Sequence, residues 1–164
     1  DLGYYIEKYS LWSGYTPETR GVMLAYSSIY GNTENAANIL ACRLRESGIP
    51  LVMYDTSVTD HSHILAEAFK YSHLVLASPT YNGRAFVTME QLLHEIARHN
   101  LQGRTVAFID NGTWAAMATK EMKAILEPLK NTTFIETSLT MKSALGKGRE
   151  GDIQALVEAI KATF

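Results

Sequence analysis

The chain has 164 residues, 46% of them hydrophobic and 20% charged, a composition that suits one globular domain and excludes a disordered chain. Its 15 basic and 17 acidic residues give a formal net charge of -2, so the chain lacks the excess positive charge that favours binding to nucleic acid. The single cysteine excludes an internal disulfide and a cysteine-ligated metal cluster. No apolar run reaches the roughly 18 residues of a membrane span, and without a signal peptide we expect a cytoplasmic protein.

The first 20 residues differ from the rest of the chain. They fit no alternating strand and helix pattern and are rich in aromatic residues, namely Tyr4, Tyr5, Tyr9, Trp12 and Tyr15. One interpretation is an N-terminal extension that packs on its own domain. The other is a connector whose aromatic side chains pack on a domain outside this chain. Composition alone slightly favours the first interpretation.

From residue 21 onward, short apolar runs alternate with helical patterns. Near-continuous apolar runs at 22–26, 74–77 and 106–109 predict parallel strands that are covered on both faces. The more mixed runs at 51–55 and 134–139 predict strands nearer a sheet edge. Five strands in alternation with five helices predict a doubly wound parallel α/β sheet with helices on both faces.

The predicted helices carry their own start and stop signals. Gly48 stands where a glycine would end the first of them, and Thr88 with Gln91 resembles a capping box. Cys42 falls within the first helix, where we expect a small buried apolar group. The five histidines are expected at the surface or at helix ends. Helices are predicted at 36–44, after His61, from Thr88, at about 115–129 with Pro128 at or beyond its end, and at 153–160.

Ligands of such sheets bind beyond the carboxyl ends of the strands, which directs attention to three loops. Loop 27–33 offers hydroxyls, a glycine and an amide at a helix N-terminus, which favours an anion. Because no Lys or Arg lies between Arg20 and Arg43, neutral donors would hold it, as suits one buried phosphate monoester. The alternative is an ordinary turn with Asn32 or Thr33 as N-cap, and spacing alone leaves the two about even.

The loops after the third and fourth predicted strands have a common composition. Loop 78–86 and loop 110–115 each contain an Asn-Gly pair, which favours a turn, and each carries an aromatic residue at the binding edge. Tyr81 and Trp114 would flank a planar ring. Either loop alone is most simply a turn, whereas three such loops at three matching strand ends indicate a binding site.

These residues bring out a family resemblance. Ser-Ser-Ile-Tyr-Gly-Asn-Thr-Glu at 27–34 resembles the phosphate loop of flavodoxins. Ser-Pro-Thr-Tyr-Asn-Gly at 78–83, with Asn-Gly-Thr-Trp at 111–114, is similar to the flavodoxin-like domain of flavodiiron proteins, or A-type flavoproteins. The resemblance covers about residues 21–162. It implies a flavodoxin-like fold with strand order 2-1-3-4-5, an FMN-binding domain at 21–164 and a connector at 1–20.

The resemblance also implies a role for each matching residue. Asn111 and Thr113 depart from the residues that are commoner in the family, which affects hydrogen bonding at the pyrimidine edge of the flavin. A hypothesis follows from Asn82-Gly83: because glycine tolerates both signs of φ, a peptide flip there would turn a carbonyl toward flavin N5 upon one-electron reduction. The implied FMN-binding residues are Ser27, Ser28, Tyr30, Gly31, Asn32 and Thr33 around the phosphate, Pro79, Thr80, Tyr81, Asn82 and Gly83 on one side of the isoalloxazine, and Asn111, Gly112, Thr113 and Trp114 on the other.

The implied function is electron transfer from a rubredoxin-type protein or a reductase to a di-iron centre that reduces dioxygen or nitric oxide. In the family, that centre lies in a preceding metallo-β-lactamase-like domain, and the flavin of one subunit meets the centre of another in a homo-oligomer. Asp1 in place of Met accords with a piece of such a chain, in which we expect no metal site or catalytic residue. Two alternatives stay open: a free-standing flavodoxin, which usually carries more acidic charge than -2, and a binding module without redox role.

Overall fold

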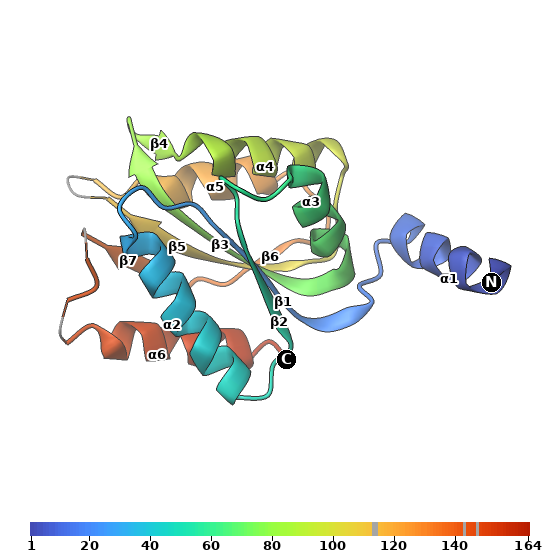
Figure 1. Ribbon diagram of the computed structural model, residues 1–164, viewed down its shortest axis with the longest axis horizontal. Coiled ribbons are helices and arrows are strands. Elements are labelled where there is room, and N and C mark those ends of the chain that lie inside the picture. Colours follow the sequence, from blue (N-terminus) through green and yellow to red (C-terminus); the bar gives the residue numbers. More distant parts are fainter. Residues whose placement is uncertain (113–114, 143, 147) are drawn as a thin grey trace.

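The computed structural model describes residues 1–112, 115–142, 144–146 and 148–164. Its centre is a parallel sheet in the order β2-β1-β3-β5-β6, with β7 also paired to β5 (Figure 1). The predicted strand order 2-1-3-4-5 is therefore confirmed, because the fourth predicted strand is β5 and the fifth lies beside it. The strands are β1 Thr19–Tyr26, β2 Leu51–Asp55, β3 Tyr71–Tyr81, β4 Arg84–Ala85, β5 Thr105–Asn111, β6 Thr133–Phe134 and β7 Leu139–Met141.

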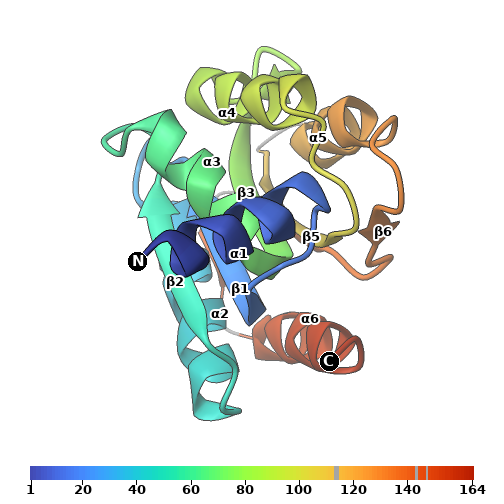
Figure 2. The same ribbon diagram turned by 90° about the vertical axis from the view of Figure 1, so that its right-hand side faces the viewer.

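Helices cover both faces of the sheet, as Figure 2 shows, with α3, α4 and α5 on one side and α2 and α6 on the other. Successive side chains of a strand point to opposite faces, so each strand supplies both hydrophobic cores. Val22 and Leu24 of β1 pack toward α2 and α6, whereas Met23 and Ala25 pack toward α3, α4 and α5. The helices are α1 Leu2–Ser13, α2 Asn32–Glu46, α3 His61–Lys70, α4 Val87–Arg98, α5 Ala118–Leu126 and α6 Glu150–Lys161.

Several local predictions are confirmed. Gly48 has φ of +82° and follows the last turn of α2, where its amide donates to the carbonyl of Arg45. Helix α5 ends before Pro128, and α6 buries Ile153, Leu156, Val157 and Ile160 on one face. The central strands β1, β3 and β5 are buried over most of their length, whereas β2 is half-buried throughout, as predicted for an edge strand.

Other local predictions are wrong. Helix α4 has Phe86 as its N-cap, and the Thr88 hydroxyl lies 2.9 Å from that of Thr56 instead of forming a capping box. Cys42 is exposed, because the buried face of α2 is formed by its neighbours. His73 is buried, with 5% of its surface exposed. The predicted fifth strand at 134–139 is split into β6 and β7, and β1 begins at Thr19, ahead of the apolar run at 22–26 that predicted it.

The chain forms a tight hairpin at the end of β3. Tyr81 pairs antiparallel with Arg84 of β4, so Asn82 and Gly83 are the two turn residues. Their φ angles of +51° and +72° are those of the turn type that Asn-Gly pairs favour. The turn predicted from this pair is therefore confirmed.

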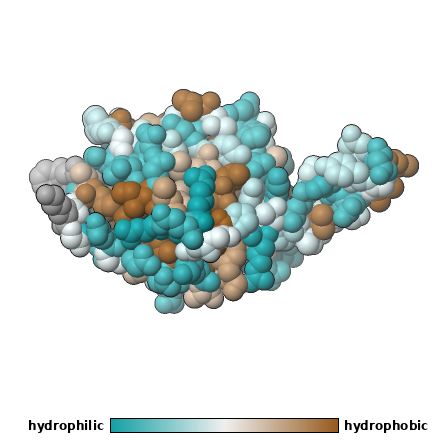
Figure 3. Space-filling view, turned by 60° about the horizontal axis from the view of Figure 1, so that its bottom comes forward, coloured by the Kyte–Doolittle hydropathy of each residue, from teal (hydrophilic) through white to brown (hydrophobic). Residues whose placement is uncertain are grey.

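Helix α1 lies apart from the layered body and buries none of its side chains (Figure 1). It is attached near its end, where the indole of Trp12 donates to Glu18 at 2.8 Å and Lys8 forms an ion pair with the same carboxylate. Figure 3 shows it projecting at one end of the molecule with hydrophobic side chains at its tip. Leu2, Tyr5 and Tyr9 are each more than two-thirds exposed. No helix in the described part of the chain is long and apolar enough to cross a membrane.

Candidate functional site

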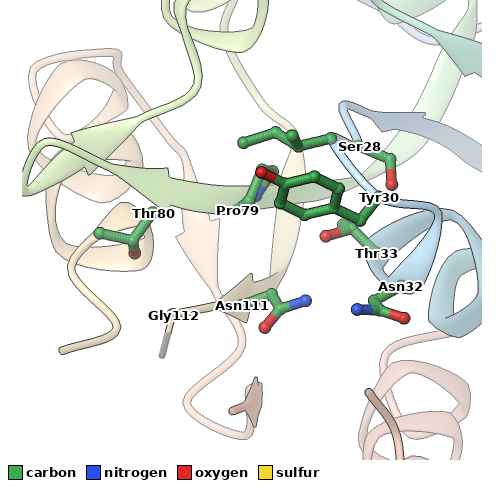
Figure 4. Close-up of a pocket in the computed structure, with 9 residues that line it drawn as sticks. Ser28, Tyr30, Asn32, Thr33, Pro79, Thr80, Asn111 and Gly112 are labelled. Atoms are coloured by element: carbon green, nitrogen blue, oxygen red, sulfur yellow. The ribbon is translucent and has the colours of Figure 1, made fainter. Parts of the chain in front are cut away.

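A pocket lies beyond the carboxyl ends of β1, β3 and β5, beside the N-terminus of α2 (Figure 4). All three loops singled out in the sequence contribute to it. In Figure 4 the side chains of Asn32 and Asn111 extend toward one another from opposite sides. The lining residues are Ser28, Ile29, Tyr30, Asn32, Thr33, Pro79, Thr80, Asn111 and Gly112.

The lining is polar but uncharged. The described lining residues offer hydroxyl groups, side-chain amides and the first turn of α2, whose dipole favours an anion. Gly31 precedes the helix with φ of +85°, a conformation that glycine adopts without strain, and its amide donates to the Ser28 hydroxyl at 3.0 Å. The arrangement suits an anion held by neutral donors, as predicted from the absence of Lys and Arg in this loop.

The volume of this pocket is about 110 Å³, below the roughly 300–1,000 Å³ of a pocket that encloses a whole cofactor. A cavity of that size accommodates a phosphate group and the start of the chain attached to it. A ring system attached to that phosphate would therefore lie along the rim, where Tyr30 and Tyr81 are exposed.

Of the residues predicted to bind FMN, the structure brings most into the pocket and leaves others outside it. Ser28, Tyr30, Asn32, Thr33, Pro79, Thr80, Asn111 and Gly112 line it. Ser27, Gly31, Tyr81, Asn82 and Gly83 do not, and Thr113 and Trp114 lie outside the described residues. Ile29 also lines the pocket; it is an apolar residue inside the phosphate-loop motif and was not predicted to bind FMN.

Ser27 lies outside the pocket because it faces the other side of the sheet. It is fully buried, and its hydroxyl donates to that of Ser78 at 3.3 Å. Ser78 in turn accepts a hydrogen bond from the amide of Phe86 at 2.9 Å. These two serines join the ends of β1 and β3 to the start of α4.

Asp110 directly precedes Asn111 of the pocket, and its carboxylate is bonded to Thr80 and to the start of α5. It is almost fully buried, and burial raises the pKa of its carboxyl, while hydrogen bonds from Thr119 and Thr80 act in the opposite direction. Its oxygens accept from the Thr80 hydroxyl at 3.0 Å and from the amide of Thr119 at 2.9 Å. The sequence could have indicated this role, because a carboxylate at the end of a buried apolar strand needs hydrogen-bond donors close by.

Gly112 allows a close approach of the chain to itself. A Cβ atom at this position would lie 2.6 Å from the carbonyl oxygen of Ala115 and 2.9 Å from Cα of Ala116. Both atoms belong to the backbone, so no side-chain rotation would relieve the contact. The backbone after β5 therefore requires glycine at this position.

The hairpin is anchored from the side of α5. The carboxylate of Glu121 accepts hydrogen bonds from the amide of Ala85 and from Nε of Arg84, the latter at 3.1 Å. The same guanidinium donates to Glu90 of α4 at 2.9 Å. Among the described residues, no group of three or more His, Cys, Asp or Glu side chains is arranged to hold a metal ion.

The donor set fits the phosphate end of FMN. A phosphate monoester would meet the first turn of α2 and the side chains of Ser28, Asn32 and Thr33.

The comparisons with known proteins agree with this geometry. The sequence profile of the flavodoxin family matches residues 24–162. An uncharacterised protein of Methanocaldococcus jannaschii is 27% identical over 140 residues, and the rubredoxin-oxygen oxidoreductase of Megalodesulfovibrio gigas is 24% identical over 115 residues. These matches cover 85% and 70% of this chain but 35% and 28% of the relatives. The chain thus spans about a third of their length.

Solved structures of two kinds share the fold. Rubredoxin oxygen:oxidoreductase from Desulfovibrio gigas has a TM-score of 0.86 at 21% identity, over 98% of this chain and 39% of its own. The flavodiiron protein from Giardia intestinalis has a TM-score of 0.83 at 20% identity, over 96% of this chain and 38% of its own. A flavodoxin from Streptococcus pneumoniae has a TM-score of 0.68 at 21% identity, over 87% of this chain and 99% of its own.

The family profile covers most of the chain, and the fold, the site and the solved structures agree with it. This chain therefore belongs to the flavodoxin family and matches the flavodoxin-like part of flavodiiron proteins.

Proposed function

We propose that this chain is an FMN-binding electron-transfer domain that passes electrons to a di-iron centre reducing dioxygen or nitric oxide. The observation that carries the proposal is the uncharged pocket at the carboxyl ends of β1, β3 and β5, beside the start of α2. Flavodoxin family membership implies FMN as the cofactor. When bound, the flavin supplies one- and two-electron redox chemistry, and the protein binds it, orients it and tunes its potential.

The residues divide into those that would hold the phosphate and those that would orient the ring. Ser28, Asn32 and Thr33 would donate to the phosphate together with the first amides of α2. Pro79 and Asn111 would border the ring from the loops after β3 and β5. The exposed rings of Tyr30 and Tyr81 would shield it from water at the rim.

Three observations support the di-iron context over a free-standing flavodoxin. The two flavodiiron structures cover 98% and 96% of this chain, whereas the Streptococcus flavodoxin covers 87% of it. The net charge of -2 lacks the acidic surface typical of a flavodoxin that shuttles between partners. Helix α1, with its exposed aromatic residues, would serve as a connector that packs against the di-iron domain of the full protein. A rubredoxin-type protein or a reductase would supply the electrons, and a homo-oligomer would bring flavin and di-iron centre together.

The cofactor proposal is tested by the visible absorption spectrum of the purified chain and by titration of the apoprotein. We expect flavin bands that are released on denaturation, and FMN that binds at least about tenfold more tightly than riboflavin because the pocket binds the phosphate. Equal affinity for riboflavin and FMN would contradict the phosphate assignment. A colourless protein that does not take up FMN would favour the binding module without redox role.

The di-iron context is tested on the full-length protein encoded by the gene. Sequencing upstream of residue 1 should reveal a cluster of His, Glu and Asp residues that ligate iron. The reduced full-length protein should then be reoxidised by dioxygen or nitric oxide faster than the isolated chain. An upstream region without such a cluster would favour the free-standing flavodoxin.

A further inference from the structure

Helix α5 has no side-chain cap of its own. Its N-cap position is occupied by Met117, which carries no side-chain hydrogen-bond acceptor for the amides of the first turn. The amides of Met117 and Ala118 donate instead to the hydroxyl oxygen of Thr80, at 2.8 and 3.0 Å. The next amide, that of Thr119, donates to Asp110 at 2.9 Å. The start of α5 is thus capped by residues from the ends of β3 and β5.

The cap joins the two loops that border the pocket. Thr80 follows Pro79 in the loop after β3, and Asp110 directly precedes Asn111 and Gly112 in the loop after β5. The Thr80 hydroxyl donates to the Asp110 carboxylate at 3.0 Å, so the two capping residues are also bonded to each other. The first turn of α5 therefore cannot move away from either loop without breaking a hydrogen bond to Thr80 or Asp110.

The hydroxyl of Thr80 has no hydrogen-bonding capacity left for a ligand. A threonine hydroxyl has one proton to donate and two lone pairs to accept with. Its proton goes to Asp110, and its lone pairs accept from the amides of Met117 and Ala118. The side chain lines the pocket, as Figure 4 shows, but its polar atom is fully used by the cap.

We propose that Thr80 and Asp110 are positioning residues, which fix the spacing of the two flavin-binding loops by capping α5 across the fold. This inference rests on the proposed function, because it assigns Thr80 an indirect role at the FMN site. The simpler alternative is that the Thr80 hydroxyl binds the flavin directly. The two possibilities differ in what happens to the start of α5 when no flavin is bound.

The experiment compares three variants of this chain with the wild type, as apoprotein and with FMN. Thr80→Val replaces the hydroxyl by a methyl group of similar size, and Thr80→Ser restores it. Thr56→Val is the matched control, because it removes a buried hydroxyl that bonds to Thr88 at 2.9 Å outside the pocket. Amide hydrogen exchange of Met117 and Ala118 in the apoprotein reports on the cap. The FMN dissociation constant and the flavin midpoint potentials report on the site.

We expect Thr80→Val to speed exchange at both amides and to weaken FMN binding by about tenfold, because the two loops would no longer be held at one spacing. The midpoint potentials should shift as well. Thr80→Ser should restore all three quantities, and Thr56→Val should leave them at the wild-type values. Asp110→Asn provides a second variant, in which exchange at Thr119 should rise most.

Two outcomes would overturn the inference. Faster exchange in Thr80→Val with unchanged FMN affinity and potentials would mean that the cap does not position the loops. Weaker FMN binding with unchanged exchange would mean that Thr80 contacts the flavin directly. If the wild type itself did not bind FMN, the proposed function would fail, and exchange in the apoprotein would still decide whether the cap exists.

Discussion

The two ends of the sheet each contain a buried charge that is held by a helix end. At the amino end, Arg104 is 2% exposed and donates to the carbonyls of Ala68 and Phe69 in the last turn of α3, at 3.2 and 2.7 Å. At the carboxyl end, Asp110 is 1% exposed and accepts from the first turn of α5. Each charge meets the helix end whose dipole has the opposite sign.

The surroundings of the two charges differ. Arg104 also donates to the carbonyls of Tyr15 and Gln102, so it ties the segment after α1 to the body at an end without pocket loops. Asp110 lies next to the loops that border the pocket. Burial lowers the pKa of Arg104 to about 10 and raises that of Asp110. The same physical device therefore stabilises the fold at one end and shapes the site at the other.

The separation of the two ends is tested most strongly by Arg104→Met. The variant leaves four buried or half-buried carbonyls without their donor, which should lower the free energy of unfolding by about 3 kcal/mol or more. Urea unfolding measures this loss. The FMN affinity of the folded variant should equal that of the wild type. Arg98→Met, at an exposed position on α4, is the control and should change stability by less than about 0.5 kcal/mol.

If folded Arg104→Met bound FMN about tenfold more weakly, the amino end would be coupled to the site across the whole sheet, and the division between the ends would be wrong.

The second test concerns pH and His73, at the same amino end. The ring stacks on Phe164 at 3.9 Å between centroids and lies 2.9 Å from the Thr163 hydroxyl. Burial, reinforced by Arg20, lowers the pKa of His73 from 6.5 to about 4. The folded protein therefore binds this proton more weakly than the unfolded chain, so the contribution is complete above pH 6.5 and is lost as pH falls toward 4.

The expected loss is about 3 kcal/mol of unfolding free energy between pH 7 and pH 4. Unfolding curves of the wild type and of His73→Gln at both pH values isolate it, because other titrating groups are common to the two proteins. The variant should lose less stability than the wild type on acidification by that amount. Equal losses would show that His73 titrates normally.

The third test moves to the carboxyl end, where Gly112→Ala would push the loop after β5 out of its course. The contact of 2.6 Å with the backbone of Ala115 requires a shift of the loop, so we expect FMN to bind about tenfold more weakly. The unfolding free energy should fall by less than about 2 kcal/mol. Gly146→Ala, where the added methyl meets no atom within 4 Å, is the control. Unchanged FMN binding in Gly112→Ala would remove this loop from the site.

The sequence predicted those parts of the fold that depend on local pattern. The runs in β1, β3 and β5 are continuous and apolar because both faces of these strands are buried, so their number and order followed from the sequence and the family resemblance. The loops at their ends were found for the same reason. What depends on contacts distant in sequence was missed: Thr88 bonds to Thr56 instead of capping α4, and His73 is buried by Phe164.

The same limit applies to the candidate site. Ser28, Asn32 and Asn111 reach the pocket as the motif predicted, because the first and last lie where a strand ends and Asn32 lies where α2 begins. The role of Thr80 was not predicted, because it depends on a hydrogen bond to Asp110, 30 residues away, and on the start of α5. A motif thus identifies which residues gather at a site, whereas the partners of each polar atom decide what that residue does there.

The smallest expected effect is that of Gly83→Ala at the hairpin, where the cost of backbone strain can be separated from any effect on the flavin potentials. Gly83→Ala adds a methyl group that meets no atom within 4 Å, so the only cost is the φ of +72°, about 1 kcal/mol. Gly48→Ala is a matched control, with φ of +82°, equally open space and a position at the end of α2 far from the hairpin in sequence. Both variants should lose similar stability in urea. Only Gly83→Ala should change the gap between the two one-electron potentials of bound FMN, because a peptide flip at Asn82-Gly83 needs the freedom of glycine. If both gaps equalled that of the wild type, the flip would have no part in tuning the flavin, and the influence of the carboxyl end would rest on the α5 cap alone.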